Sequence, residues 1–193
     1  MNEQVFWKLM EASKAESNLP HERILFIQKE LTRLEEYYIF KFDKVLIWLL
    51  NKANSFDLWT AGRVLTSESD KQSFEYFRYW LMMQGQRTFK KTLDDAEYLE
   101  LFIADFKSNS INIKDYAELS LIAERAYSIK TSERNYKFVQ PFDLLKDLLD
   151  GEMENNNHVI EDILPVLCQG MGWNNEIVEG NWLSDDNELE IKN

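Results

Sequence analysis

The sequence predicts an all-α protein: a single orthogonal bundle of many helices over residues 1–150, followed by an irregular acidic extension over residues 151–193 that is partly ordered at most. Apolar residues recur with a helical period of three to four residues almost throughout the bundle. A chain of 193 residues that is 45% hydrophobic can bury one large core. The extension holds ten acidic residues against the single base Lys192, so most of the net charge of −12 lies there.

The first three helices are predicted over residues 3–17, within 17–34 and over 35–52. The first carries its apolar side chains on one face and its charged side chains off it. The second begins near Asn18, a residue type that caps helix starts, and it has Pro20 in its first turn, where the missing N–H costs nothing. The polar run NKANS has no helical period and ends the third helix.

Further along the chain, the pattern predicts a shorter helix in FDLWTAGRVL, with Asp57 as its N-cap, and a break at TSESD that supplies capping residues for the next helix. Two more amphipathic helices follow in LDDAEYLELFIADF and KDYAELSLIAERAYSIKT. Asp94 and Asp95 lie at a helix start, where acidic side chains cap backbone N–H groups. Beyond residue 131, KFVQPF is expected to be extended and DLLKDLLDG to be a short helix that ends at Gly151.

The chain lacks the residues of the common metal and catalytic centres. His21 and His158 are far apart, neither has a second histidine or a cysteine one helical turn away, and there is no cysteine pair, so no metal site or cofactor is predicted. The segment CQGMGW contains G-x-G without the rest of a phosphate-binding loop, and its glycines are expected to end a helix. Cys168 follows an apolar run and is expected to be a buried small hydrophobe rather than a nucleophile.

The acidic balance argues against a nucleic-acid partner, because proteins that bind phosphate backbones carry basic surfaces. A basic protein, such as a toxin, is the complementary partner. The longest nearly uncharged apolar run, VLIWLL, is far too short to cross a membrane. With one cysteine and no leader of charged and apolar regions, the protein is expected to be cytoplasmic.

The stretch Phe74–Phe89, FEYFRYWLMMQGQRTF, is densely apolar, and we first treat it as one helix. On a helical wheel its large apolar side chains cover more than half of the circumference, which predicts core packing on several sides. Glu75, Arg78 and Gln86 fall on the narrow remaining face, which is expected to contact solvent.

Two polar residues of this stretch, Gln84 and Arg87, project into the apolar arc and are expected to be at least partly buried, where each needs a hydrogen-bond partner. In a structural role, Arg87 would lie along Trp80 or pair with an acid such as Asp57, and Gln84 would bind a loop backbone. In a functional role, both would line a cleft, walled by Trp59 and Trp80, that accepts a planar or anionic ligand.

Four segments carry a family resemblance: QVFWKLMEAS near the start, FDLWTAGRVL, FEYFRYWLMMQGQRTF and AELSLIAERAYSIKT. In this order they resemble the bacterial domain-of-unknown-function family numbered 4240, over residues 1–135. The resemblance implies a helical domain with no established activity or catalytic residues, and an acidic extension outside the shared region. The chain departs from the family at TSESD, where members often have a glycine pair before a serine and two acids, and where only Ser69 and Asp70 match. The positions that fit the family are Phe6, Trp7, Asp57, Trp59, Phe74, Tyr76, Phe77, Arg78, Trp80, Gln84 and Gly85.

Two functional hypotheses follow. The first hypothesis is a non-enzymatic binding protein, most concretely an immunity or inhibitor protein that neutralises a basic toxin or nuclease. It is favoured because the chain lacks metal-binding and nucleophile sets and has an excess of acids. A variant of it is a protein whose acids mimic the phosphates of a nucleic acid. The partner-binding residues of this hypothesis would be Trp173, Trp182, Asp185 and Asp186, although an acid excess also simply keeps a protein soluble. The alternative is an enzyme or sensor for a small ligand, with a cleft lined by Asp57, Trp59, Arg78, Gln84 and Arg87.

Overall fold

The computed structural model describes residues 1–132, 158–159, 164–172 and 177–178, and within them it confirms the predicted all-α fold. The exception is a minimal antiparallel pair of two-residue strands, β1 (His158–Val159) and β2 (Ile177–Val178), in which His158 pairs with Val178 and Val159 with Ile177. The predicted extended run KFVQPF and the predicted helix that ends at Gly151 lie outside the described residues. No helix among the described residues is long and apolar enough to cross a membrane.

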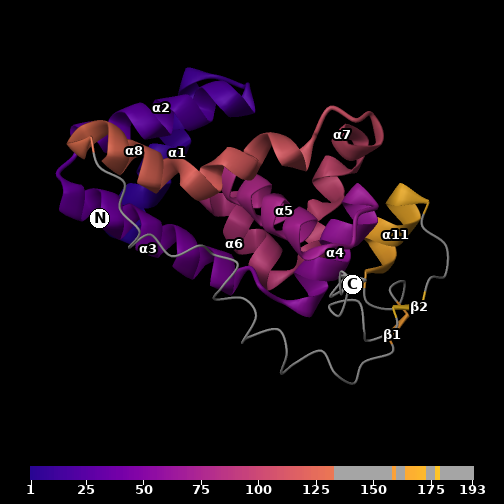
Figure 1. Ribbon diagram of the computed structural model, residues 1–193. Coiled ribbons are helices and arrows are strands. Elements are labelled where there is room, and N and C mark those ends of the chain that lie inside the picture. The colour runs from indigo at the N-terminus through magenta and orange to yellow at the C-terminus, as the bar shows by residue number, and fades with distance from the viewer. Residues whose placement is uncertain (133–157, 160–163, 173–176, 179–193) are drawn as a thin grey trace, which may run out of the picture.

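The helices follow one another in chain order, and two of them are 3-10 helices (Figure 1). They are α1 (Glu3–Glu16), α2 (Pro20–Arg33), α3 (Glu36–Lys52), α4 (Phe56–Thr66), α5 (Lys71–Met83), α6 (Gln86–Asp94), the 3-10 helix η1 (Ala96–Phe102), α7 (Ile103–Lys107), the 3-10 helix η2 (Ile113–Leu121), α8 (Ile122–Thr131) and α11 (Pro165–Met171).

The starts of the first four helices lie close to their predicted positions, but two predicted caps are wrong. The N-cap of α2 is Leu19 rather than Asn18, and Pro20 is the first helical residue, as expected. The N-cap of α4 is Ser55, whose Oγ accepts a hydrogen bond from the Leu58 N–H at 3.3 Å, so Asp57 lies inside the first turn. Asp57 therefore faces solvent near the positive end of the α4 dipole instead of capping it.

The break at TSESD supplies a cap, as predicted. Asp70 Oδ1 accepts a hydrogen bond from the Ser73 N–H at 2.9 Å and so begins α5. The two adjacent acids further along have different roles, because Asp94 is the last residue of α6 and Asp95 caps η1 by accepting from the Glu97 N–H at 3.0 Å. The two regions predicted as long amphipathic α-helices both begin as 3-10 helices. The two helix types place apolar residues at similar spacings, three residues per turn against 3.6, so the sequence pattern does not separate them.

The apolar stretch Phe74–Phe89 is not one helix, because the chain breaks at Gly85. This glycine has φ +96° and ψ 167°, a conformation that is open to glycine almost alone. The break ends α5 at Met83 and starts α6 at Gln86 in a new direction. Side chains after Gly85 therefore do not continue the face that they would share with α5 on a single helical wheel.

Helix α5 is the centre of the fold, and Figure 1 shows it in the middle of the molecule with α4 and α6 beside it. It packs against α1, α3, α4, α6 and η2, and beyond its first two residues every side chain except the half-buried Tyr76 is buried. A helix with no solvent face must be apolar or internally bonded all round. The consecutive residues Tyr79, Trp80, Leu81, Met82 and Met83 are each at most 1% exposed.

Aromatic rings run through this core from α4 to α7. Trp59 lies 4.7 Å from Phe74, Phe77 lies 5.4 Å from Trp80, and Trp80 in turn lies 5.0 Å from Phe106, all measured between ring centroids. Such tilted and edge-on pairs add to the stabilisation that area burial gives. The aromatic residues of the stretch Phe74–Phe89 are therefore core residues, as most of them were predicted to be.

The segment CQGMGW behaves as expected. Cys168 is buried in α11, and Gly172 ends that helix in the left-handed region at φ +73° and ψ 31°. Gly170 lies within the helix at close quarters, where a Cβ would meet the Ile103 side chain at 2.3 Å. The two glycines thus serve helix packing and helix termination.

The two glycines at positive φ predict different tolerances. Replacing Gly85 by Ala or by Asn is expected to lower the free energy of unfolding by about 2–3 kcal/mol, because its conformation excludes both residues. Gly172→Ala should cost only about 1 kcal/mol, and Gly172→Asn still less, because Asn tolerates the left-handed region. Urea unfolding of the four variants measures this, and a Gly85→Asn variant as stable as the wild type would contradict the prediction.

Candidate functional site

The five residues predicted to line a ligand cleft do not converge. Trp59 and Arg78 are buried against the same ring, that of Phe74, with centroid distances of 4.7 Å for Trp59 and 4.4 Å for the Arg78 guanidinium carbon. Asp57 is exposed in the first turn of α4, whereas Gln84 and Arg87 lie beyond the other end of α5. The hollow next to Trp59 is lined by Phe74, Phe77 and α4 side chains and is too narrow to hold a water molecule.

The burial expected for two arginines is reversed in the structure. Arg78 was expected to face solvent but is fully buried, because α5 has no solvent face. Arg87 was expected to project into the apolar arc but is exposed, because the break at Gly85 turns α6 away from the α5 register. Gln84 is half-buried, as predicted, and its Nε2 donates to the Trp80 carbonyl at 3.0 Å.

Arg78 is a buried cation that binds backbone rather than a carboxylate. Its Nη1 donates to the Leu50 carbonyl in the last turn of α3 at 3.1 Å, and its Nε donates to the Phe74 carbonyl at 3.4 Å. Burial lowers the pKa of the guanidinium to about 10, so Arg78 is still charged at neutral pH. The carbonyl ends of α3 carry partial negative charge, and Arg78 neutralises them inside the core.

Three titratable groups lie around Arg78 on α5 and α3. The Tyr79 hydroxyl donates to Glu75 Oε1 at 2.7 Å, and burial, together with the nearby Glu75 charge, raises the pKa of Tyr79. Asp43 on α3 is almost buried, and this burial raises the pKa of its carboxyl to about 6. Glu75 was expected to face solvent but is buried, because this part of α5 is covered by other helices. Asp43 was missed by the sequence analysis, although it recurs at helical spacing with the buried residues Ile39 and Leu46.

A polar junction forms where α5 ends, and it contains Ser13, Lys14, Arg23, Gln84 and Tyr116 from four different helices. Arg23 Nη2 donates to the Met83 carbonyl at 2.6 Å and its Nε to Ser13 Oγ at 3.4 Å. Lys14 Nζ donates to the Gln84 carbonyl at 3.4 Å. These cations satisfy the last carbonyls of α5, which have no partner within the helix.

Within this junction, burial lowers the pKa of Arg23 and raises the pKa of Tyr116, whose hydroxyl also forms a hydrogen bond with the Gln84 side chain. Arg23 was missed by the sequence analysis, although it lies one helical turn before Ile27 on the apolar face of α2. The junction therefore gives Gln84 a structural explanation, since its amide and its carbonyl both bind neighbouring groups in the chain.

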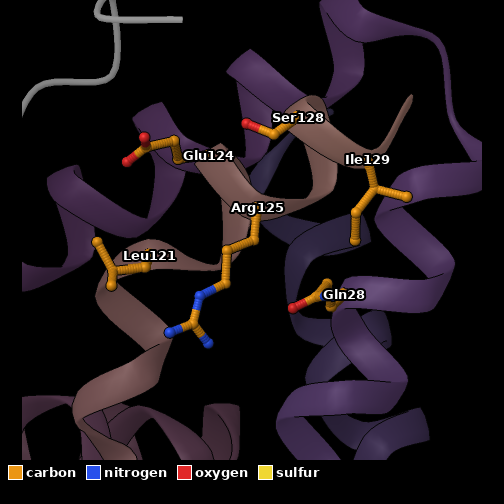
Figure 2. Close-up of a pocket in the computed structure, with 6 residues that line it drawn as sticks. All are labelled: Gln28, Leu121, Glu124, Arg125, Ser128 and Ile129. Carbon is orange, nitrogen blue, oxygen red and sulfur yellow. The ribbon is translucent and has the colours of Figure 1, made fainter. Parts of the chain in front are cut away.

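An open depression of about 470 Å³ lies elsewhere, between α2 and α8 (Figure 2). Gln28 from α2 and Arg125 from α8 lie on its two sides, with Leu121 and Ile129 as apolar lining. Arg125 Nη1 is 3.2 Å from Glu118 Oε1, so its charge is already partly neutralised. None of the predicted cleft residues takes part in this depression.

No group of three or more His, Cys, Asp or Glu side chains is placed to hold a metal ion among the described residues. The predicted partner-binding residues Trp173, Trp182, Asp185 and Asp186 lie outside the described part of the chain. The described body thus offers core polar groups, most of them hydrogen-bonded although Arg78 Nη2 and Thr92 Oγ1 are not, together with a shallow depression and its outer surface.

The fold and these groups define an all-α domain built around a fully buried helix. The chain belongs to the family described as "Protein of unknown function (DUF4240)", whose model matches residues 1–128. The match covers the helices from α1 into α8, and it ends before the acidic extension. Comparisons with curated proteins and with solved structures give no match.

Asp43 predicts a pH-dependent stability. Its carboxyl titrates at about 6 when folded, against an ordinary value of 3.8, so its ionisation opposes folding increasingly between about pH 4 and pH 6 and fully above that. Asp43→Asn should therefore raise the free energy of unfolding by up to about 3 kcal/mol at pH 7.5 relative to its effect at pH 4.

Urea unfolding of Asp43→Asn at the two pH values checks this, with the exposed Asp105→Asn as the matched control, which should change by less than about 0.5 kcal/mol at either pH. An equal effect of Asp43→Asn at pH 4 and pH 7.5 would show that burial of the charge is not the cause.

Proposed function

We propose that this protein is a non-enzymatic binding protein that recognises a basic protein partner, most concretely as an inhibitor or immunity protein of a basic toxin or nuclease. One observation carries the proposal: an exposed acidic edge, formed by Asp94, Asp95, Glu100 and Asp105, runs along the end of α6, η1 and α7. No basic residue occurs between Asp94 and Phe106. A run of exposed acids without a base between them in the sequence is complementary to a cationic surface.

The acidic edge also includes an exposed apolar side chain, and hydrogen bonds to α11 hold it in place. Leu101 is 60% exposed and lies in sequence between Glu100 and Asp105, an arrangement in which charged groups surround an apolar contact. Glu97 accepts hydrogen bonds from the backbone N–H groups of Val166 and Leu167, at 2.9 and 2.8 Å, and so fastens η1 to the start of α11. A preformed surface loses less conformational entropy on binding.

Helix α11, which precedes the acidic residues 173–193 in the chain, packs beside the helices that carry the acidic edge. Helix α11 packs against η1, α4 and α7, and the chain leaves α11 at Gly172 toward a segment that contains Trp173, Trp182 and six acidic residues. Acidic surface and acidic segment therefore support binding to the same kind of partner. The small-ligand alternative has no comparable support, because the residues proposed for its cleft lie apart.

Neutralising the acidic edge should weaken the complex. We expect Asp94→Asn/Glu100→Gln/Asp105→Asn to reduce partner affinity about tenfold or more, because three charge pairs at the interface are lost. The matched control, Glu16→Gln/Glu35→Gln/Glu36→Gln, removes the same charge from exposed residues elsewhere and should change affinity less than threefold.

The partner is first isolated by affinity capture with the tagged full-length protein at 50 and 500 mM salt, and binding is then measured by titration calorimetry. The expected partner is basic, stoichiometric and released at high salt, since exposed charge pairs are screened there. Recovery of no stoichiometric partner, or of one whose affinity is equal in both triple variants, would contradict the proposal.

A further inference from the structure

The outer face of α3 has the opposite character to the acidic edge. Tyr37, Lys41, Lys44, Trp48 and Lys52 follow one another at intervals of three or four residues, so they lie on one side of the helix, and we call them the lysine face. Tyr37 is 60% exposed and Trp48 is 42% exposed. Tyr38, next to Tyr37 in edge-on contact, is also 42% exposed, so three aromatic side chains of α3 lie open to solvent.

All exposed charges on α3 beyond its first turn are positive. The acids of this helix are Glu36 in the first turn and Asp43, which is almost buried on a different side. Lys41, Lys44 and Lys52 make no ion pair with any described residue. On a chain with a net charge of −12, the lysine face is therefore a local positive surface, in which only Lys44 interacts electrostatically with a described carboxylate, that of Asp43.

The lysines and aromatic rings of this face are organised together. Lys52 Nζ lies 3.8 Å from the centroid of the Trp48 ring, and Lys41 Nζ lies 5.3 Å from that of Tyr37. These cation–π contacts hold the ammonium groups beside the rings. A segment that binds here would meet cations and apolar surface side by side, which suits a peptide that carries carboxylates and an aromatic or aliphatic residue.

The chain itself contains such a peptide. Residues 179–193 hold Glu179, Asp185, Asp186, Glu188 and Glu190 against Lys192, with Trp182 among them. We propose that this acidic segment, residues 179–193, binds the lysine face of α3 in the same molecule, with its carboxylates on the lysines and Trp182 on the exposed aromatic rings. The proposal goes beyond the proposed function, because it concerns a contact within the free protein.

Chain length and tethering favour this occupant over a separate acidic protein. Fifteen residues reach at most about 50 Å, and a domain of this size has a radius of gyration of only about 16 Å. The lysine face ends at Lys52, and α4, which begins at Phe56, packs against α11, which is separated from Glu179 by seven residues, 172–178. A tethered segment has an effective concentration in the millimolar range, whereas a free acidic protein is repelled by the net charge of the chain.

The contact is tested on the full-length protein by zero-length carbodiimide cross-linking, with an equal mixture of ¹⁴N- and ¹⁵N-labelled protein and mapping by mass spectrometry. The expected products join Lys41, Lys44 or Lys52 to acids of residues 179–193 within one isotope, and their yield should fall at least fivefold between 50 and 500 mM salt. Products that join two isotopes would assign the face to a second copy of the chain and overturn the proposal. Products spread equally over Lys8, Lys29 and Lys107 would also overturn it.

A second measurement does not depend on lysine chemistry. The indole N–H signal of Trp48, assigned in the ¹⁵N NMR spectrum by its loss in Trp48→Phe, should shift in Asp185→Asn/Asp186→Asn/Glu188→Gln/Glu190→Gln. The matched control neutralises four exposed acids of the body, Glu16→Gln/Asp94→Asn/Glu100→Gln/Asp105→Asn, and should leave the signal in place. An unmoved signal in the first variant, or equal shifts in both, would overturn the proposal. Since no partner is present in either experiment, these results are independent of whether a basic protein binds.

Discussion

The structure depends on the burial of α5 from Ser73 to Met83. A helix that is covered on every side removes a large apolar area from water, but it also leaves no solvent for its polar side chains or for the carbonyls at its end. Inside the core, the Arg78 guanidinium donates hydrogen bonds to the Leu50 and Phe74 carbonyls and lies over the Phe74 ring. The Tyr79 hydroxyl and the Glu75 carboxylate satisfy each other by a hydrogen bond. The surrounding helices are held in place by the same contacts, so the core polar groups specify how α3 meets α5.

The second part of the problem is the end of α5, and Gly85 and the polar junction resolve it together. The chain has to leave the core at once, which Gly85 permits through a conformation that other residues rarely adopt. Arg23 and Lys14 then bind the carbonyls that the break exposes, and Glu11 lies directly against Gly85. Gln84 and Gly85 therefore have a structural role at the end of a buried helix.

Most helices could be predicted because their apolar residues follow a single face, as in α1, α2 and α3, and because local signals such as Pro20 and Asp70 act within one turn. The predictions for Arg78 and Arg87 failed for a different reason. A helical wheel assumes one continuous helix with one solvent face; α5 has no such face, and the helix does not continue past Gly85. The burial of Asp43 and Arg23 could not be predicted from the sequence either, because it depends on contacts between helices that are distant in sequence.

The surface shows a separation of charge that relates the two proposals. Acidic groups gather along η1 and α7 and in the extension, whereas α3 presents lysines alone beyond its first turn. If the acidic segment occupies the lysine face, a basic partner has to compete with three tethered ammonium groups for the same carboxylates. Its apparent affinity is then reduced by the fraction of molecules in which the segment is bound. Weakly basic proteins would be rejected and strongly basic ones accepted, so a contact within the chain would set the threshold of charge at which a partner binds.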